Sequence, residues 1–262
     1  LDSARVAGAL SGAGLFALLG MGPTYIVVTV LYLASVFLTH KAGAYVEAAP
    51  ARAATEPERP SPWRELKEGV AYVWNTPLLL AIMCLAVLLN VTTFPMMNHL
   101  LPYVAKEVYG ADQQMLGYLV PGGAFGAMVT SLLLSRLAHR IRPGRVSIIG
   151  TLTWYAALIL FAWQPSPWTG IPLLMLAGCA QSVSQVPSHA VLLRNSDERF
   201  RGRIMGIRML AIYGNVPGLL LFGPLVAALG FPATATLYCG VGIAITICLC
   251  VYWHADLWRR EA

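Results

Sequence analysis

The 262-residue sequence contains little charge. Lys, Arg, Asp and Glu together make up 11% of it, whereas a soluble domain carries about 25%. Asp and Glu number only 12, and none lies deep within a long apolar segment. So few charged residues cannot cover a water-soluble globule of this length, which excludes an ordinary soluble enzyme. The high apolar content likewise excludes a disordered chain.

Motifs typical of enzymes and metal sites are also missing. The sequence contains no His-Glu-x-x-His, no Gly-x-Ser-x-Gly and no phosphate-binding Gly-x4-Gly-Lys. The five cysteines lie in apolar segments without metal-type spacing next to His, so we interpret them as free thiols. We therefore expect no enzymatic activity, no metal site and no cofactor.

Long apolar segments are abundant instead. Hydrophobic residues make up 57% of the sequence, and the mean hydropathy is +0.64. A bilayer core requires about 20 apolar residues per helix. Eight such segments occur, at 4–20, 22–39, 77–101, 114–137, 146–163, 170–192, 204–229 and 232–253. We predict an all-α polytopic membrane protein with eight transmembrane helices, whose immediate partner is the lipid bilayer.

The distribution of basic residues predicts the orientation. The net charge is +6, and Lys and Arg cluster in alternate links between the apolar segments. If both termini and every second link are cytoplasmic, 16 of the 18 basic residues fall on that side, all except Lys106 and Arg208. This predicts a multi-pass protein of the inner (cytoplasmic) membrane. Nucleic-acid binding is not expected, because the basic residues form no exposed face interleaved with aromatic residues.

The long link at 40–76 has two parts. Residues 42–60 are rich in Ala, Pro and Glu and are predicted to form a flexible tether. Ser61 and Pro62 are typical of a helix start, and Trp63, Val70 and Trp74 then share one helical face. We predict an amphipathic helix over 62–74 on the cytoplasmic leaflet; a soluble helix packed on a partner is the alternative.

Three segments resemble one transporter family. They are WRELKEGV at 63–70, LLPYV at 100–104 and RGRIM at 201–205. In these segments and in its layout, the chain resembles the major facilitator superfamily, in particular the exporter branch with bacterial enterobactin exporters and macrolide or multidrug efflux pumps.

The resemblance implies a domain organisation. Members have twelve helices in two six-helix halves, and this chain matches helices five to twelve. It follows that 1–39 holds the last two helices of the N-terminal half and 40–76 a cytoplasmic linker. Residues 77–253 then form the C-terminal six-helix half, and 254–262 a cytoplasmic tail. The complete architecture would be a partial bundle of six helices plus two.

The implied function is secondary active transport. Family members of this branch export small amphipathic organic compounds, such as drugs or siderophores, by alternating access and usually against protons. In this chain His189 is the one residue inside a predicted helix that titrates near neutrality, so the residues leave proton coupling open. The alternatives are an incomplete, non-transporting membrane fragment or interaction subunit, and a lipid flippase of the same fold.

Polar side chains within the apolar segments are the candidate pathway residues. Gln181, Gln185 and His189 recur every four residues, with Ser182, Ser184 and Ser188 expected to widen their face. A second face, interrupted by Pro95, holds Asn90, Phe94 and Met97, and Tyr213 and Asn215 lie near the middle of 204–229. We expect these residues to line the pathway of a small-molecule substrate, with helix packing as the alternative.

Four arginines are candidate gating residues: Arg140, Arg201, Arg203 and Arg208. Arg208 follows Arg203 by five residues and so lies about 7.5 Å further along a helix. It either extends to the membrane interface or pairs with a carboxylate from helices outside this chain. Separately, the Gly8–Gly12, Gly122–Gly126 and Gly214–Gly218 pairs have the spacing that lets helix backbones approach closely.

Overall fold

The computed structural model describes residues 21–47, 61–111, 113–137 and 142–253, and every regular element in them is helical. In order these are α2 (Met21–Glu47), α3 (Pro62–Trp74), α4 (Pro77–Thr92), η1 (Pro95–His99), α5 (Leu101–Tyr103), η2 (Val104–Val108), α6 (Gln113–Leu137), α7 (Pro143–Ala162), α8 (Pro167–Arg194), α9 (Glu198–Leu210), η3 (Ala211–Gly214), α10 (Asn215–Leu229) and α11 (Phe231–Tyr252).

Six helices in the described residues are long and apolar enough to cross a membrane. They correspond to six of the eight predicted segments, with α9, η3 and α10 forming one continuous span. The segment at 4–20 lies outside the described residues. The segment at 170–192 forms the 28-residue helix α8, which is not among the six spans. Its glutamines, serines and histidine lower its hydropathy, and the expected count of eight is not confirmed within the described residues.

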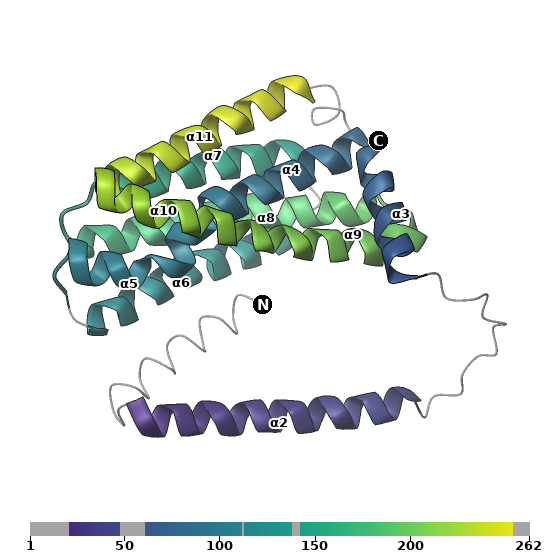
Figure 1. Cartoon of the computed structure of the whole chain (residues 1–262), viewed down its shortest axis with the longest axis horizontal. Helices are drawn as coiled ribbons and strands as arrows, with labels where there is room; N and C mark the ends of the chain where they lie inside the picture. Colours follow the sequence, from purple (N-terminus) through teal and green to yellow (C-terminus); the bar gives the residue numbers. More distant parts are fainter. Residues whose placement is uncertain (1–20, 48–60, 112, 138–141, 254–262) are drawn as a thin grey trace.

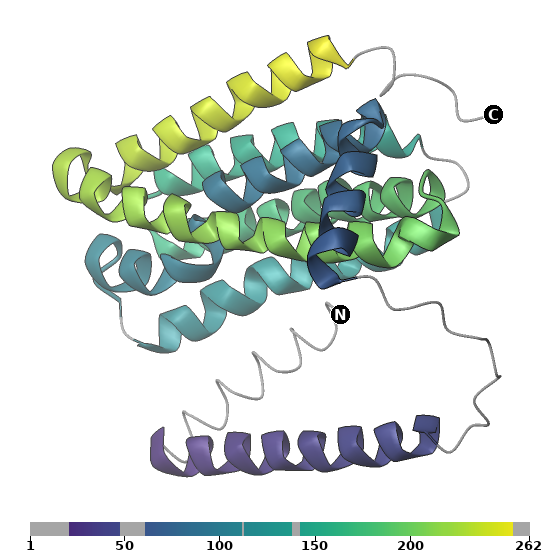
Figure 2. The same cartoon turned by 45° about the vertical axis from the view of Figure 1, so that its right-hand side comes forward.

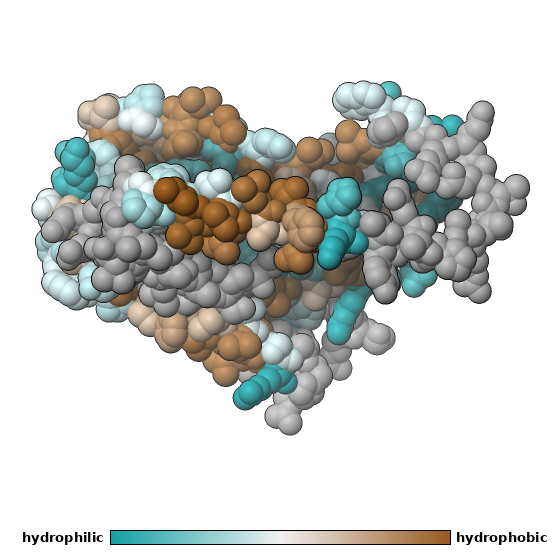
Figure 3. Space-filling model, turned by 90° about the horizontal axis from the view of Figure 1, so that it is seen from below, coloured by the Kyte–Doolittle hydropathy of each residue, from teal (hydrophilic) through white to brown (hydrophobic). Residues whose placement is uncertain are grey.

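The helices from α4 onward lie side by side, whereas α2 lies apart from them (Figures 1 and 2). Within this bundle α8 packs against both α6 and α7, and α11 packs against α7 and α4. The core is aromatic, and Trp154, Tyr155, Phe161 and Phe222 are fully buried in it. Apolar residues also remain exposed around the middle of the molecule, while hydrophilic residues gather toward its ends (Figure 3). This distribution fits a bilayer environment.

The charged ends of the bundle differ. The ends of α6 and α8 and the starts of α7 and α9 meet near α3, whereas α5 lies at the opposite end (Figure 1). The first end therefore carries most basic residues of the described bundle, among them Arg64, Arg136, Arg145, Arg194 and Arg203, and the other carries Lys106. Antiparallel helices thus collect on one side the charges that alternate along the sequence.

Two helix boundaries differ from the sequence-based expectation. The flexible tether was expected from residue 42, but α2 continues to Glu47, where alanines favour helix continuation. The predicted transmembrane segment ended at residue 101, but the backbone remains helical to Val108 through the two π-helical turns η1 and η2. Pro95 interrupts the regular α-helical hydrogen bonds as predicted, because proline lacks an N–H group. The chain continues from there as the π-helical turn η1.

Glycines allow the closest helix contacts. A Cβ atom added at Gly126 of α6 would lie 2.0 Å from the carbonyl oxygen of Met175 in α8, and one at Gly218 of α10 would lie 2.3 Å from that of Val91 in α4. Both glycines belong to predicted pairs, whereas Gly8–Gly12 lies outside the described residues. A side chain at either position would force the helices apart.

Candidate functional site

A polar cluster joins α8 to α9 inside the apolar bundle. Arg208 is buried, with 8% of its surface exposed. Its Nε donates to His189 Nε2 at 2.8 Å, and its Nη2 donates to Gln185 Oε1 at 2.5 Å. We refer to Gln185, His189 and Arg208 as the Arg208 cluster. The four-residue spacing of Gln185 and His189 puts both on the α8 face that meets α9, as helical periodicity predicts.

The two bonds of His189 define its tautomer. Its Nδ1 lies 2.7 Å from the main-chain carbonyl oxygen of Gln185, which can only accept, so Nδ1 carries the proton. Nε2 is then the acceptor for the Arg208 N–H. Both bonds are satisfied together only by the neutral imidazole, so His189 orients the guanidinium without contributing negative charge.

The serines expected to widen the glutamine face of α8 form hydrogen bonds with α6 and α7 rather than with the Arg208 cluster. Ser182 donates to the Ala127 carbonyl oxygen of α6 at 2.8 Å. Ser184 lies 2.7 Å from Thr151 of α7, and Ser188 lies 2.6 Å from Ser147 of the same helix. Ser182 and Ser188 each lie three residues from Gln185 and flank its face, and their hydrogen bonds to α6 and α7 connect three helices.

On the second predicted face, Phe94 and Met97 contact Trp154 of α7. The rings of Phe94 and Trp154 meet edge to face at 5.4 Å, and Trp154 Nε1 lies 3.1 Å from Met97 Sδ. Asn90 is buried, and its amide donates to the Ala86 carbonyl oxygen at 2.8 Å. The structure therefore supplies packing partners for this face and leaves Phe94 and Met97 partly exposed.

The remaining pathway candidates differ in exposure. Tyr213 in η3 is 70% exposed, while Gln181 is half-buried. Asn215, at the start of α10, has a buried Oδ1 without a hydrogen-bond partner among the described residues. Next to it Gly214 faces Asn90, because an added Cβ would lie 3.5 Å from that of Asn90. Asn90 and η3 thus lie together, and η3 continues from α9, which carries Arg208.

Comparison with known proteins identifies the family. The sequence profile of the Major Facilitator Superfamily matches residues 3–219 and also residues 84–261. The chain belongs to the Major Facilitator Superfamily. The overlap of the two matches covers most of the described bundle, including the Arg208 cluster.

Curated relatives include enterobactin exporters named EntS from Escherichia coli O1:K1 / APEC, from strain S88 of O45:K1 and from strain E2348/69 of O127:H6. Each is 28% identical over 188 residues, which is 71% of this chain and 44% of the relative. The match therefore spans less than half the length of these relatives.

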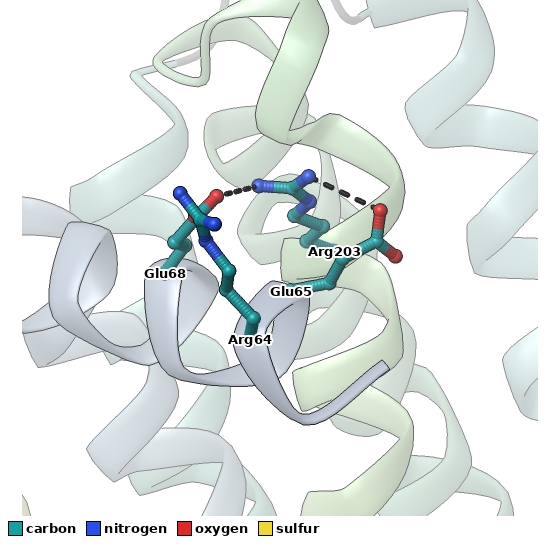
Figure 4. A network of polar contacts seen from close by, with 4 residues as sticks. All are labelled: Arg64, Glu65, Glu68 and Arg203. Carbon is teal, nitrogen blue, oxygen red and sulfur yellow. Dashed lines mark hydrogen bonds and ion pairs between the residues drawn. The ribbon is translucent and has the colours of Figure 1, made fainter. Parts of the chain in front are cut away.

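A second polar contact in this superfamily member joins α3 to α9 (Figure 4). Arg203 contacts Glu68 at 2.7 Å and Glu65 at 3.2 Å, and Arg64 also contacts Glu68 at 3.0 Å. The guanidinium groups of Arg203 and Arg64 hold the pKa of Glu68 below its usual value. Since Arg203 is only 16% exposed, it fixes α3 against the bundle more firmly than a surface pair would.

The other gating candidates have different surroundings. Arg201 donates to the Leu193 carbonyl oxygen at 3.2 Å and pairs with Glu198 at 3.5 Å. Both partners lie close to Arg201 along the sequence. Arg140 lies outside the described residues. The acidic partners of Arg203 were not singled out from sequence, although Glu65 and Glu68 are spaced to share a helical face. Fully buried Trp154 was also missed, because aromatic residues are common in membrane helices.

Proposed function

We propose that the chain is part of a secondary active transporter of the inner membrane that exports small amphipathic organic compounds by alternating access. Family membership and the named function of the enterobactin exporters support transport. The Arg208 cluster is the observation that carries the proposal. Polar groups inside an apolar bundle are costly, and in membrane proteins they mark the paths of substrates and ions.

The proposed domain organisation follows the family pattern. Residues 1–39 supply two helices of the N-terminal half, 40–76 the linker, 77–253 the C-terminal half and 254–262 the tail, with eight membrane helices in all. This gives α8 a place as a membrane helix, because its polar faces are covered by α6, α7 and α9 rather than by lipid. The end with α3 is cytoplasmic, since it collects the basic residues.

The proposed pathway has a polar part and an apolar part. Gln181, Gln185, His189 and Asn215 supply hydrogen-bonding groups, and Asn90 and Tyr213 lie where α4 meets η3. Phe94 and Met97 supply an adaptable apolar wall, since methionine accommodates ligands of different shape. Arg201 and Arg203 hold the cytoplasmic end, where opening of the gate requires α3 and α9 to separate.

Transport is tested by expressing the gene in a bacterium that lacks its main efflux pumps. We expect lower accumulation of some amphipathic dyes or drugs than in cells with an empty vector. Gln185→Leu and Asn90→Leu should each reduce this export several-fold at equal membrane abundance. Gln164→Leu is the matched control, because Gln164 lies outside the cluster and its side-chain amide donates to the Leu160 carbonyl oxygen of its own helix. Equal export by all variants would remove both residues from the pathway.

The second candidate function is that of a non-transporting membrane fragment or interaction subunit. Accumulation equal to the empty-vector level across a broad panel would support this candidate.

Adding a protonophore tests proton coupling, because export against protons stops when the gradient collapses. Reconstitution with fluorescent phospholipids tests lipid flipping in the same vesicles.

A further inference from the structure

Arg208 is held so that one part of its guanidinium group remains free. Nε and Nη2 donate to His189 and Gln185, as described above. Nη1 is buried and has no hydrogen-bond partner among the described residues. The side chain is more than nine-tenths buried, so bulk water does not surround this nitrogen. Two neutral partners therefore orient a buried cation with one donor group unused.

The positive charge of Arg208 is not compensated within the described residues. Neither Gln185 nor neutral His189 carries negative charge, and no Asp or Glu occurs in α4, α6, α7, α8, α10 or α11. In α9 the single acidic residue is Glu198, ten residues away, which pairs with Arg201. A buried charge without a counter-charge is costly, and ionisable groups inside membrane bundles mark substrate and ion pathways.

A second unpaired polar atom lies further along the same rod. Asn215 follows Arg208 by seven residues, which corresponds to about 10–12 Å through the 3-10 turn of η3. Its buried Oδ1 has no partner among the described residues. With three residues at 3.6 per turn and four at 3.0 per turn, the two side chains leave the rod about 60° apart, on neighbouring sides. The Asn215 acceptor thus lies about 10–12 Å along the rod from Arg208, whose Nη1 donor is unused.

From this geometry we propose that Arg208 and Asn215 bind one small organic anion. The carboxylate or other oxyanion accepts from Arg208 Nη1, and a hydroxyl or amine at the far end of the molecule donates to Asn215. Gln185 and His189 are positioning residues that orient the guanidinium. With its Nε and Nη2 edge already used, Arg208 holds the anion through Nη1 alone, which suits a site that must release its ligand. The inference rests on the proposed transport function and specifies the substrate class.

Binding is measured on the whole purified chain in nanodiscs of phosphatidylcholine. The probe is radiolabelled 4′-hydroxybiphenyl-4-carboxylate, which separates a carboxylate from a hydroxyl by about the required length. Its primary amide has nearly the same shape without the charge. We expect the acid to bind at least tenfold more tightly than the amide, and Arg208→Gln to remove that preference. Arg194→Gln is the matched control, because it removes an exposed arginine and should change neither affinity.

A thermal melt separates binding from a structural role. If Arg208 is kept for an anion, the ligand-free Arg208→Gln chain should melt at the wild-type midpoint or above it, because an uncompensated charge has gone. If it serves only to join α8 to α9, the midpoint should fall. Asn215→Leu should weaken the acid several-fold and leave binding of biphenyl-4-carboxylate, which lacks the hydroxyl, unchanged.

Several results would overturn the inference. They are failure of the acid to bind, equal binding of acid and amide, or full acid binding by Arg208→Gln. Displacement of the acid by phosphatidylglycerol, with Arg208-dependent retention of that lipid, would assign the site to a lipid headgroup and equally overturn it. Binding without export would refute the proposed function alone. Export that ignores substrate charge and survives Arg208→Gln would refute only the anion site.

Discussion

The contact between α6 and α8 provides the sharpest test of the packing. Gly178 of α8 is buried against the α6 backbone, and a Cβ there would lie 1.9 Å from the Gly123 carbonyl oxygen and 3.1 Å from the Ala127 nitrogen. Both neighbours are main-chain atoms and cannot rotate away. Ordinary contact begins at 3.4 Å, so Gly178→Ala requires α6 and α8 to separate by about 1.5 Å at this level.

The separation has a calculable cost. Overpacking a well-filled interior costs about 1–3 kcal/mol. The same movement stretches the 2.8 Å bond from Ser182 to the Ala127 carbonyl oxygen, and such bonds in membrane proteins contribute about 0.6 kcal/mol. The gain in helix propensity from Gly to Ala offsets up to about 1 kcal/mol. We expect a net loss of about 0.5–2.5 kcal/mol, with most of the helix content retained.

Reversible unfolding in mixed detergent micelles, followed by circular dichroism, measures this loss. The control is Gly240→Ala in α11, where an added Cβ meets no atom within 4 Å. That variant should match the wild type or exceed its stability slightly. If Gly178→Ala is as stable as Gly240→Ala, the two helix backbones do not approach this closely, and the account of the α6–α8 interface is refuted.

Three further predictions concern single polar contacts. Arg203→Gln should increase hydrogen exchange in α3 several-fold, as should acidification of the wild type. The lowered pKa of Glu68 means that its contribution is present above the usual Glu pKa and is lost as pH falls through the folded value; unchanged exchange in both cases would contradict the ion-pair account. Tyr155→Phe removes the 2.8 Å bond to Thr92 and should cost about 1 kcal/mol, whereas exposed Tyr252→Phe should cost nothing measurable by the same unfolding assay. A double-mutant cycle with Thr151→Val and Ser184→Val should give a coupling energy of about 0.6 kcal/mol between α7 and α8, and a value near zero would argue against their 2.7 Å contact.

Much of the candidate site could be anticipated from helical periodicity. The four-residue spacing of Gln185 and His189 correctly placed them on one face, and Arg208 was recognised as an arginine displaced along its helix from the basic end. The sequence did not indicate that these residues bind one another. It left open an arginine extending to the membrane interface or one paired with a carboxylate from helices outside this chain, whereas Arg208 is buried and the described residues supply an amide and an imidazole.

The tertiary structure also divided residues that the sequence grouped together. Ser182, Ser184 and Ser188 are close in sequence to Gln185, but they face α6 and α7. Phe94 and Met97 share the predicted face with Asn90, yet Trp154 of α7 covers part of it. Periodicity gives the angle between side chains on one helix. It does not give the identity of the neighbouring helix at each angle.

The sequence by itself determined the environment and the secondary structure, since the length of apolar segments and the scarcity of charge are properties of the chain alone. Pro62 and Pro95 likewise acted locally, as their backbone chemistry requires. Which helices meet, and therefore which polar groups are satisfied, was decided by packing. Arg203 finds Glu68 across 135 residues, and Arg208 keeps an unused donor, because three-dimensional proximity is independent of distance along the sequence.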